Sequence, residues 1–150
     1  MNAKYKILQV TNLTESMMMD CYYIAARSRP SNADDIYYTL QNNVNNRGHI
    51  MFVAMGQDHT VHGFISGHLV PKHVGVTETE IDWVFVNSQC QRHGIGGALM
   101  RAYMEYCSDH GATQAVVKPA RTIQAKQFYT KHGFIPRSVI SMVRNLARGR

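Results

Sequence analysis

The sequence predicts a single α/β domain, an α+β arrangement around a mixed sheet, with the element order β-α-α-β-β-β-α-β-α-β-β. Its 150 residues suffice for one domain, expected to span 1–150, that buries about two-thirds of its unfolded surface. Stretches of alternating apolar residues are interleaved with stretches in which apolar residues recur every three or four positions, and these are the patterns of strands and helices. A glycine-rich segment at 94–97 lies where a predicted strand gives way to a predicted helix.

The first third of the chain predicts one strand and two helices. Residues 4–10 alternate weakly and form the first strand. Thr14 is a suitable N-cap for a helix, because apolar residues recur at helical spacing after it. After a proline-containing break, Asn32 caps a second helix that ends near Gly48.

The middle third predicts three strands. Residues 50–55 and 61–70 flank residues 56–59, whose glycine and aspartate are typical of a hairpin turn. Residues 71–75 predict another turn, which leads into a strand over 77–86.

The last third predicts two helices and two or three strands. An apolar stripe over 99–110 predicts a helix, and residues 112–118 predict a short strand. A helix over 122–131 ends at Gly133 in a left-handed cap. Residues 134–146 supply one or two final strands.

Composition and cysteine content indicate the cellular setting. Apolar residues make up 45% of the chain and charged residues 17%, which is ordinary for a soluble globule. No apolar run approaches the ~20 residues of a membrane span, and the N-terminus lacks a signal-peptide core. Cys21, Cys90 and Cys107 are odd in number and lack C-x-x-C spacing, which indicates free thiols. We therefore expect a cytoplasmic protein with no membrane partner.

Charge is unevenly distributed along the chain. Residues 1–90 hold 6 Lys+Arg and 8 Asp+Glu, whereas residues 91–150 hold 10 and 2. A basic half is compatible with nucleic-acid binding. A polyphosphate cofactor on that half, with a cationic amine approaching the other, is the simpler interpretation, because no basic helix or aromatic-basic repeat is present.

The glycine-rich segment and the residues before it predict a phosphate site. Glycines allow backbone amides to converge, and a helix that starts there adds unpaired amides and the positive end of its dipole. Gln91 and Arg92 add a donor and a positive charge. The dinucleotide and P-loop fingerprints both fail, since Leu99 stands where the former needs glycine and no Gly-Lys-Ser/Thr follows. The alternative is a helix start that only packs closely. The predicted phosphate-site residues are Gln91, Arg92, His93, Gly94, Ile95, Gly96 and Gly97.

Two segments resemble the motifs of one family. Residues 91–96 resemble the pyrophosphate motif Q/R-x-x-G-x-G/A of the GNAT N-acetyltransferases, and residues 125–134 resemble that family's later A-x-x-F-Y-x-x-x-G-F segment. The spacing between them fits one helix and one strand. The resemblance covers about 61–146 and implies the acyl-CoA N-acyltransferase fold.

The resemblance also implies an activity. Members transfer an acetyl group from acetyl-CoA to a primary amine, on a small molecule or a protein, by direct attack in a ternary complex without a metal. The backbone of Val84, Phe85 and Val86 is implied to bind the pantetheine arm and the oxyanion, with side chains in the core. Position 93, often Arg, Lys or Gly, is His93 here. Thr122 stands where an asparagine commonly begins the later helix; it can cap that helix, and the resemblance implies a cofactor contact.

Three acids on the strand at 77–86 are candidates for the catalytic base. A protonated alkylamine titrates near ~10.4, so a base must remove its proton at neutral pH. Period-2 alternation predicts that Glu78, Glu80 and Asp82 share one face. The opposite face is expected to carry Ile81, Trp83 and Phe85. The resemblance places Glu80 at the family's basic glutamate, with Asp82 as the alternative and Glu78 as a residue that holds the amine. Otherwise, the three carboxylates are a solvated strand face.

Tyr129 is the candidate acid. The resemblance places it where many members have the tyrosine that protonates the coenzyme A thiolate. The alternative is an aromatic core pair with Phe128, and for Phe128 we prefer the core role. Cys90 is expected to be a small loop residue and not a covalent nucleophile. His59 and His62 lack the spacing of metal ligands, so we expect no metal.

Two other functions stay open. A non-catalytic coenzyme A or nucleic-acid binding module would have kept the fold without the chemistry. An acetyltransferase acting on an RNA-linked amine, such as aminoacyl-tRNA, would use the basic C-terminal half. Homodimers are frequent in the family, although no feature of this sequence demands one.

Overall fold

The computed structural model describes residues 4–29, 33–43, 46–117, 122–137 and 142–147. The chain divides into two compact units, Met1–Pro119 and Ala120–Arg150. The first unit carries the sheet and the first three α-helices, and the second unit carries the last helix.

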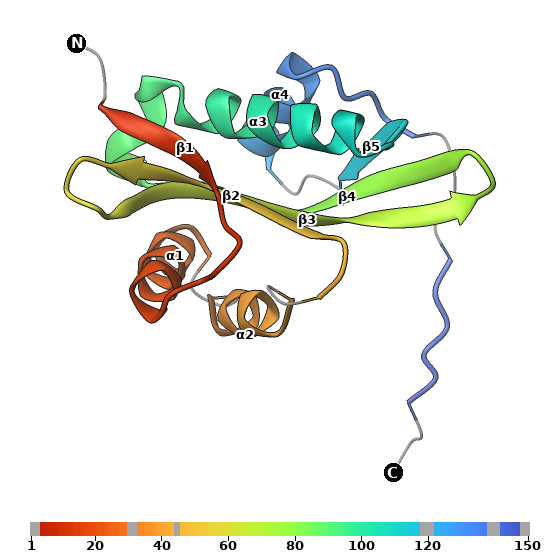
Figure 1. Ribbon diagram of the computed structural model, residues 1–150, viewed down its shortest axis with the longest axis horizontal. Helices are drawn as coiled ribbons and strands as arrows, with labels where there is room; N and C mark the ends of the chain where they lie inside the picture. Colours follow the sequence, from red (N-terminus) through yellow and green to blue (C-terminus); the bar gives the residue numbers. More distant parts are fainter. Residues whose placement is uncertain (1–3, 30–32, 44–45, 118–121, 138–141, 148–150) are drawn as a thin grey trace. The chain divides into compact units, whose positions relative to one another are not determined.

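A five-stranded mixed sheet forms the centre of the first unit (Figure 1). Its strands lie in sequence order, and the first three pairings are antiparallel whereas the last, between β4 and β5, is parallel. The mixed sheet predicted from the sequence is therefore confirmed. The strands are β1 (Tyr5–Gln9), β2 (His49–Gly56), β3 (Val61–His73), β4 (Val76–Val86) and β5 (Gln114–Val117).

Helices cover both faces of this sheet. In Figure 1, α1 (Glu15–Ser28) and α2 (Ala33–Asn43) lie against one face, and α3 (Ile95–Asp109) lies against the other. Thr14 caps α1 as predicted, because its Oγ1 accepts a hydrogen bond from the amide of Met17 at 3.2 Å. The predicted cap of the second helix, Asn32, lies outside the described residues.

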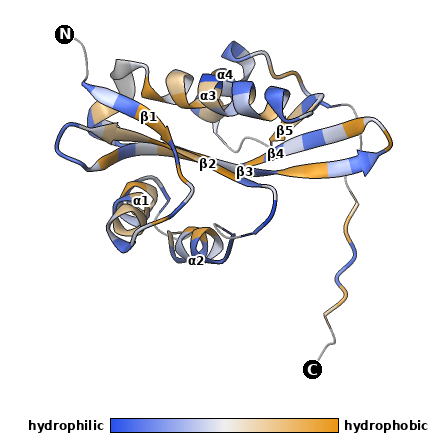
Figure 2. Cartoon of the chain, viewed as in Figure 1, coloured by the Kyte–Doolittle hydropathy of each residue, from blue (hydrophilic) through white to orange (hydrophobic). Residues whose placement is uncertain are grey.

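The main hydrophobic core lies between the sheet and the first two helices. Figure 2 shows hydrophobic residues along the middle of the sheet and hydrophilic ones on the outer side of α2. The buried residues of this core are Val10, Cys21, Ile24, Ala25, Ile36, Leu40, Met51, Val53, Val61, Phe64 and Phe85. The helical spacing that predicted α1 and α2 thus marks the stripes that pack on the sheet. None of the helices in the described part of the chain is long and apolar enough to span a bilayer.

The two hairpins differ in how well the sequence predicted them. The turn after Gly56 forms as predicted, and the amide of Gly56 donates to the carbonyl of Thr60 at 2.9 Å. The predicted turn at 71–75 is wrong for its first three residues, because β3 continues to His73. Pro71 pairs with Thr77 beside a register irregularity, which is where a strand tolerates a residue without an N–H.

The second unit contains α4 (Ile123–Lys131), which the sequence predicted. Thr122 caps it, since its Oγ1 accepts a hydrogen bond from the amide of Ala125 at 3.0 Å, and Gly133 has the predicted positive φ of 90°. The final strands predicted in 134–146 are not found in the described part, where 134–137 and 142–147 have no regular structure. The apolar side chains there are mostly exposed, so no alternating buried face forms: Ile135, Met142, Val143 and Leu146.

Gly67 allows α3 to approach the sheet closely. A Cβ on Gly67 would collide with the Tyr103 hydroxyl and with the carbonyl oxygen of Glu80. We expect Gly67→Ala to lower the free energy of unfolding by about 1–3 kcal/mol, the usual cost of overpacking a core. Urea titration followed by circular dichroism measures it.

A Tyr103→Phe background is the matched control for that substitution. Removing the hydroxyl relieves one of the two collisions, so Gly67→Ala should cost less there than in the parent protein. An unchanged urea midpoint for Gly67→Ala in the parent would contradict the packing described.

Candidate active site

The segment between β4 and α3 is a short 3₁₀-helix, η2 (Ser88–His93), where the sequence predicted a loop. Asn87 caps it, because its Oδ1 accepts a hydrogen bond from the amide of Gln89 at 3.2 Å. Gly94 follows with a φ of 73°, in the left-handed region that favours glycine. The predicted glycine turn at the start of a helix is therefore confirmed.

The first turn of α3 has no side-chain cap. The amide of Ala98 is the one that donates to the Gly94 carbonyl, at 3.0 Å. The amides of residues 95–97 precede this bond and have no acceptor within the helix. The buried side chain of Ile95 fixes their position. These amides and the helix dipole favour an anion at this point.

The end of β4 lies beside this helix start. A Cβ built on Gly63, which pairs with Val86, would be 3.0 Å from Cγ2 of Ile95 and 3.1 Å from the carbonyl oxygen of Phe85. The N-terminal turn of α3 thus packs on Gly63 of β3, which is the partner of Val86 across the sheet.

The last residues of β4 have a free edge. The pairing of β4 with β5 covers only Glu78 to Ile81 of β4. In the part of the chain that the structure describes, no strand pairs with 82–86 on that side, while β3 occupies the other side. The side chain of Phe85 is buried as predicted, whereas those of Val84 and Val86, also predicted to be in the core, are only half-buried. The backbone of residues 82–86 can therefore pair with an extended ligand while the Phe85 side chain stays in the core.

A β-bulge changes the faces predicted for β4. Ser66 pairs with Trp83 and Gly67 with Ile81, so Asp82 is an extra residue without a partner on β3. The prediction that Trp83 and Phe85 lie opposite the three acids is wrong, because an unpaired residue reverses the alternation beyond it. Phe85 is part of the core between the sheet and the first two helices, and Trp83 packs against that core. Ile81 is paired with Gly67 on the face covered by α3, as expected.

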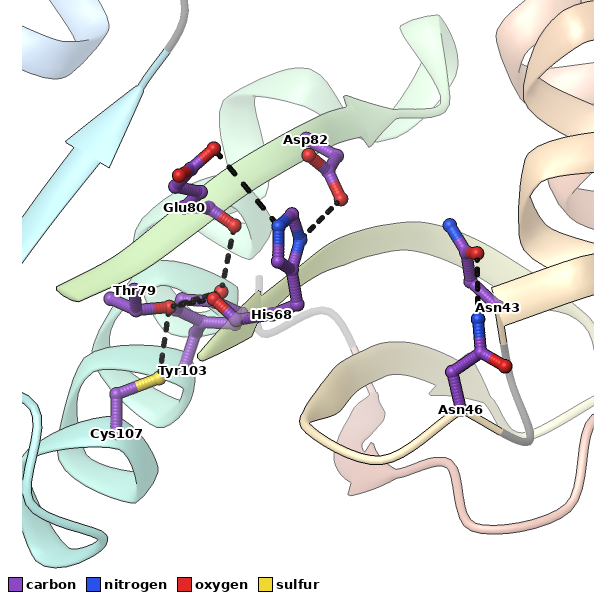
Figure 3. A network of polar contacts seen from close by, with 8 residues as sticks. All are labelled: Asn43, Asn46, His68, Thr79, Glu80, Asp82, Tyr103 and Cys107. Carbon is purple, nitrogen blue, oxygen red and sulfur yellow. Dashed lines mark hydrogen bonds and ion pairs between the residues drawn. The ribbon is translucent and has the colours of Figure 1, made fainter. Parts of the chain in front are cut away.

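Glu80 and Asp82 converge on His68, a residue that the sequence analysis did not single out (Figure 3). His68 Nδ1 lies 3.1 Å from Oδ2 of Asp82, and Nε2 lies 4.0 Å from Oε1 of Glu80. His68 lies directly across from Glu80 in the β3–β4 register. The bulge brings the side chain of Asp82 to the other edge of the same imidazole ring.

The three side chains differ in exposure. Asp82 is 12% exposed, whereas Glu80 is 36% and His68 40% exposed. Glu78 is buried, and its Oε1 lies 3.6 Å from Nζ of Lys72. Glu80 is therefore the accessible carboxylate, while Asp82 is held by His68 and Glu78 by Lys72.

A pocket of about 160 Å³ opens beside His68. Its lining residues are Asn43, Asn46, Arg47, His49 and His68. The two asparagines contact each other, since Nδ2 of Asn46 donates to Oδ1 of Asn43 at 3.2 Å (Figure 3). Burial lowers the pKa of His49, and the nearby Asp82 carboxylate partly opposes this. Amide, guanidinium and imidazole groups thus offer several hydrogen bonds to a polar molecule.

On the opposite face, a buried hydroxyl network holds β4 in place. Oγ1 of Thr79 lies 2.6 Å from the Tyr103 hydroxyl and donates to the carbonyl of His68 at 3.2 Å. Cys107 donates its thiol hydrogen to Thr79 at 3.4 Å. Burial raises the pKa of Tyr103 far above its ordinary value, so the phenol stays neutral. The network fixes the strand register that places Glu80 across from His68.

Tyr129 lies on α4 in the second unit. Its half-buried ring contacts Phe128 edge-on at 5.3 Å between centroids and Phe134 at 5.5 Å. Its backbone carbonyl accepts a hydrogen bond from the Phe134 amide at 3.0 Å, which closes the turn after the helix. The ring is therefore held within α4 and the following turn, and its role as acid stays a prediction.

Cys90 has a polar neighbour that the sequence analysis did not anticipate. Its Sγ lies 3.8 Å from Nδ1 of His62, whose Nε2 lies 3.3 Å from Oδ1 of Asp58. Hydrogen bonds from Thr60 lower the pKa of Asp58. All three cysteines are free thiols, as predicted. Within the described ranges, no three His, Cys, Asp or Glu side chains gather in a way that could hold a metal ion.

Comparison with known proteins identifies the class. Residues 14–134 match the model of the Acetyltransferase (GNAT) family. This match covers most of the chain, and the chain therefore belongs to the GNAT acetyltransferase family. Among curated protein sequences, none matches it.

Solved structures share the fold. An aminoglycoside acetyltransferase from an uncultured soil metagenomic sample, in complex with sisomicin, is 17% identical with a TM-score of 0.78, over 95% of this chain and 97% of that one. The aminoglycoside N-acetyltransferase AAC(6')-Iy in complex with CoA is 15% identical with a TM-score of 0.76, over 98% of each chain. Glucosamine-6-phosphate N-acetyltransferase from Arabidopsis thaliana is 15% identical with a TM-score of 0.68, over 96% and 99%. At these identities the similarity establishes the acyl-CoA N-acyltransferase fold.

Proposed function

We propose that the protein transfers an acetyl group from acetyl-CoA to a primary amine by direct attack in a ternary complex. The observation that carries this proposal is the placement of two open backbone features side by side. One is the free edge of β4 over 82–86, and the other is the uncapped first turn of α3. An extended arm with amide groups can pair with a strand edge, and a diphosphate can bind at a helix N-terminus.

These features fit an acyl-coenzyme A. The strand edge and the helix start both bind through main-chain groups. The side chains at these positions can therefore be apolar and pack in the core. Arg92 belongs to the half of the sequence that is rich in Lys and Arg, which favours a polyphosphate ligand. When bound, acetyl-CoA supplies an electrophilic thioester carbonyl and a thiolate leaving group. A backbone N–H of β4 would stabilise the oxyanion that develops there.

Glu80 is proposed as the base for the amine, directly or through a water molecule. An ammonium group must lose a proton before it attacks, and Glu80 is the accessible carboxylate on the site face of β4. Asp82, the alternative base, is engaged with His68. Tyr129 is proposed as the acid that protonates the thiolate. A phenol has a pKa near ~10 and a thiol has a pKa near ~8.5. The phenol can therefore protonate the thiolate only if the two groups are in contact.

A small molecule is the acceptor we favour. The pocket beside His68 is small and lined with polar groups, which suits a hydroxylated amine better than a protein surface. The named substrates of two structures with this fold, an aminoglycoside acetyltransferase and glucosamine-6-phosphate N-acetyltransferase, are amino sugars. A protein amine is the second candidate.

Release of free coenzyme A from acetyl-CoA tests the proposal. The panel should contain aminoglycosides, amino sugars, polyamines and peptides with a free N-terminus or lysine. Turnover with at least one amine, and mass-spectrometric detection of the N-acetyl product, is the expected result. Binding of acetyl-CoA without turnover across the panel would instead identify a non-catalytic coenzyme A module.

An RNA-linked amine is tested separately. The excess of Lys and Arg after residue 90 is the observation that keeps aminoacyl-tRNA as a candidate acceptor. A salt-dependent gel shift with tRNA would support it, and no shift at low salt would remove it.

A further inference from the structure

His68 is placed to handle a proton at the site. One edge of its ring faces Asp82 and the other faces Glu80, and the ring also lines the pocket. We propose that His68 is a proton relay, which takes the amine's proton from Glu80 and passes it to solvent, with Asp82 holding the ring in the required tautomer. This inference rests on the proposed function, because the proton in question is the one lost by the acceptor amine.

The tautomer follows from the contact with Asp82. A carboxylate only accepts hydrogen bonds, so the nitrogen 3.1 Å from Oδ2 must carry the hydrogen, which is Nδ1. The neutral ring then has its lone pair on Nε2, and Nε2 is the atom on the Glu80 side. Asp82 is 12% exposed, and little water competes for this contact.

The relay conserves atoms and charge. An N–H bond of the ammonium breaks, and the proton moves to a carboxylate oxygen of Glu80, directly or through a water molecule. It then moves to Nε2 of His68, which becomes an imidazolium beside the Asp82 carboxylate, and Glu80 is again a carboxylate. The gap of 4.0 Å between Nε2 and Oε1 closes by a side-chain rotation or a bridging water. Because the His68 side chain is 40% exposed, the proton can leave to solvent.

The charged and titratable groups around His68 come from three directions. Glu80 and Asp82 face it from β4, and both favour an imidazolium. His49 pairs with it on β2, and Arg47 lines the same pocket. Arg47 opposes a positive charge on His68, whereas the lowered pKa of His49 favours an uncharged ring there. The two carboxylates are therefore what makes a transient imidazolium acceptable here.

Backbone contacts keep the relay in register. The hydroxyls of Thr79 and Tyr103 lie 2.6 Å apart, and they are 3.2 Å from the His68 carbonyl and 3.3 Å from the Glu80 carbonyl, respectively. Both strands are thus fixed at the two residues that exchange the proton.

The pH dependence of kcat/KM tests the relay. The profile of the parent protein should contain one ionisation that His68→Asn lacks, because the relay needs a neutral ring to accept the proton. We expect His68→Asn to lower kcat about 10²-fold, the lower end of the contribution of a positioned acid or base, with the KM for acetyl-CoA unchanged. His73→Asn, an exposed histidine at the end of the same strand, is the matched control and should keep both rate and profile.

Asp82→Asn provides a second, independent test. The new amide can donate to Nδ1, which would move the ring hydrogen to Nε2 and turn the lone pair away from Glu80. Long-range ¹H–¹⁵N spectra of the folded protein report the tautomer without any substrate. We expect hydrogen on Nδ1 in the parent and on Nε2 in Asp82→Asn, with a loss of kcat similar to that of His68→Asn.

The outcomes separate the relay from the proposed function. If the parent acetylates an amine but His68→Asn keeps its rate and its ionisation, the relay is overturned and the acetyltransferase stands. If the parent turns over no amine, the proposed function fails and the relay fails with it. If the parent ring carries its hydrogen on Nε2, the relay is overturned whatever the rates are.

Discussion

Replacing Glu80 by glutamine should lower kcat about 10²- to 10⁴-fold, the range that a positioned general base contributes. Glutamine keeps the size of the side chain and its place across from His68, but it cannot take a proton. The loss should appear in kcat, because the free edge of β4 and the start of α3 are main-chain features that this substitution leaves intact. Steady-state release of coenzyme A at saturating amine measures the effect.

The matched control is Glu105→Gln, an exposed glutamate on α3. It removes the same charge without touching the site, and its kcat should equal that of the parent. Dependence on pH adds a second check: raising the pH should recover part of the Glu80→Gln loss, since more of the amine is then already deprotonated. A Glu80→Gln enzyme with parental kcat at neutral pH would remove Glu80 as the base.

Replacing Tyr129 by phenylalanine should lower kcat about 10²-fold or more if the phenol protonates the departing thiolate. The ring makes edge-to-face contacts with Phe128 and Phe134, and phenylalanine keeps those contacts, so the thermal midpoint should hardly change. Rates with saturating acetyl-CoA report the loss of the hydroxyl, and calorimetry reports any change in cofactor affinity.

Tyr38→Phe, on the exposed side of α2, is the control for that substitution. It removes an exposed phenol hydroxyl that does not line the pocket beside His68, and it should leave kcat unchanged. Equal rates for Tyr129→Phe and the parent would assign Tyr129 to packing only, which is the alternative that its aromatic neighbours favour.

Local signals in the sequence predicted much of the fold. The caps at Thr14 and Thr122 and the left-handed glycines at Gly94 and Gly133 are short-range features, each set by one side chain or one backbone angle. The helix start after Gly94 was predictable for the same reason. Strand boundaries were harder to predict. A proline such as Pro71 is typical of a turn, but here it lies at a register irregularity of a longer hairpin.

The arrangement of the site could not be predicted from spacing, because it depends on strand register. Alternation gave the correct side for Glu80 and Ile81, but a bulge at Asp82 reverses it for Trp83 and Phe85. No pattern along the chain announces that one extra residue. His68 was missed because a single histidine in an apolar strand has no motif. Its role depends on its pairing with Glu80 on β4. Following the register of the β3–β4 hairpin residue by residue would have identified it.

Cofactor binding in the proposed function depends most on the backbone amides at the start of α3, and calorimetry with acetyl-CoA tests them directly. Gly94→Ala forces a Cβ into a left-handed position, at a cost of about 1–2 kcal/mol. Gly111→Ala imposes the same strain beyond the other end of the helix, where a Cβ also meets open space, and is the matched control. We predict that the parent and Gly111→Ala bind acetyl-CoA with equal affinity and that Gly94→Ala binds at least ~10-fold more weakly. No binding heat from the parent, or equal affinity in all three proteins, would contradict the account.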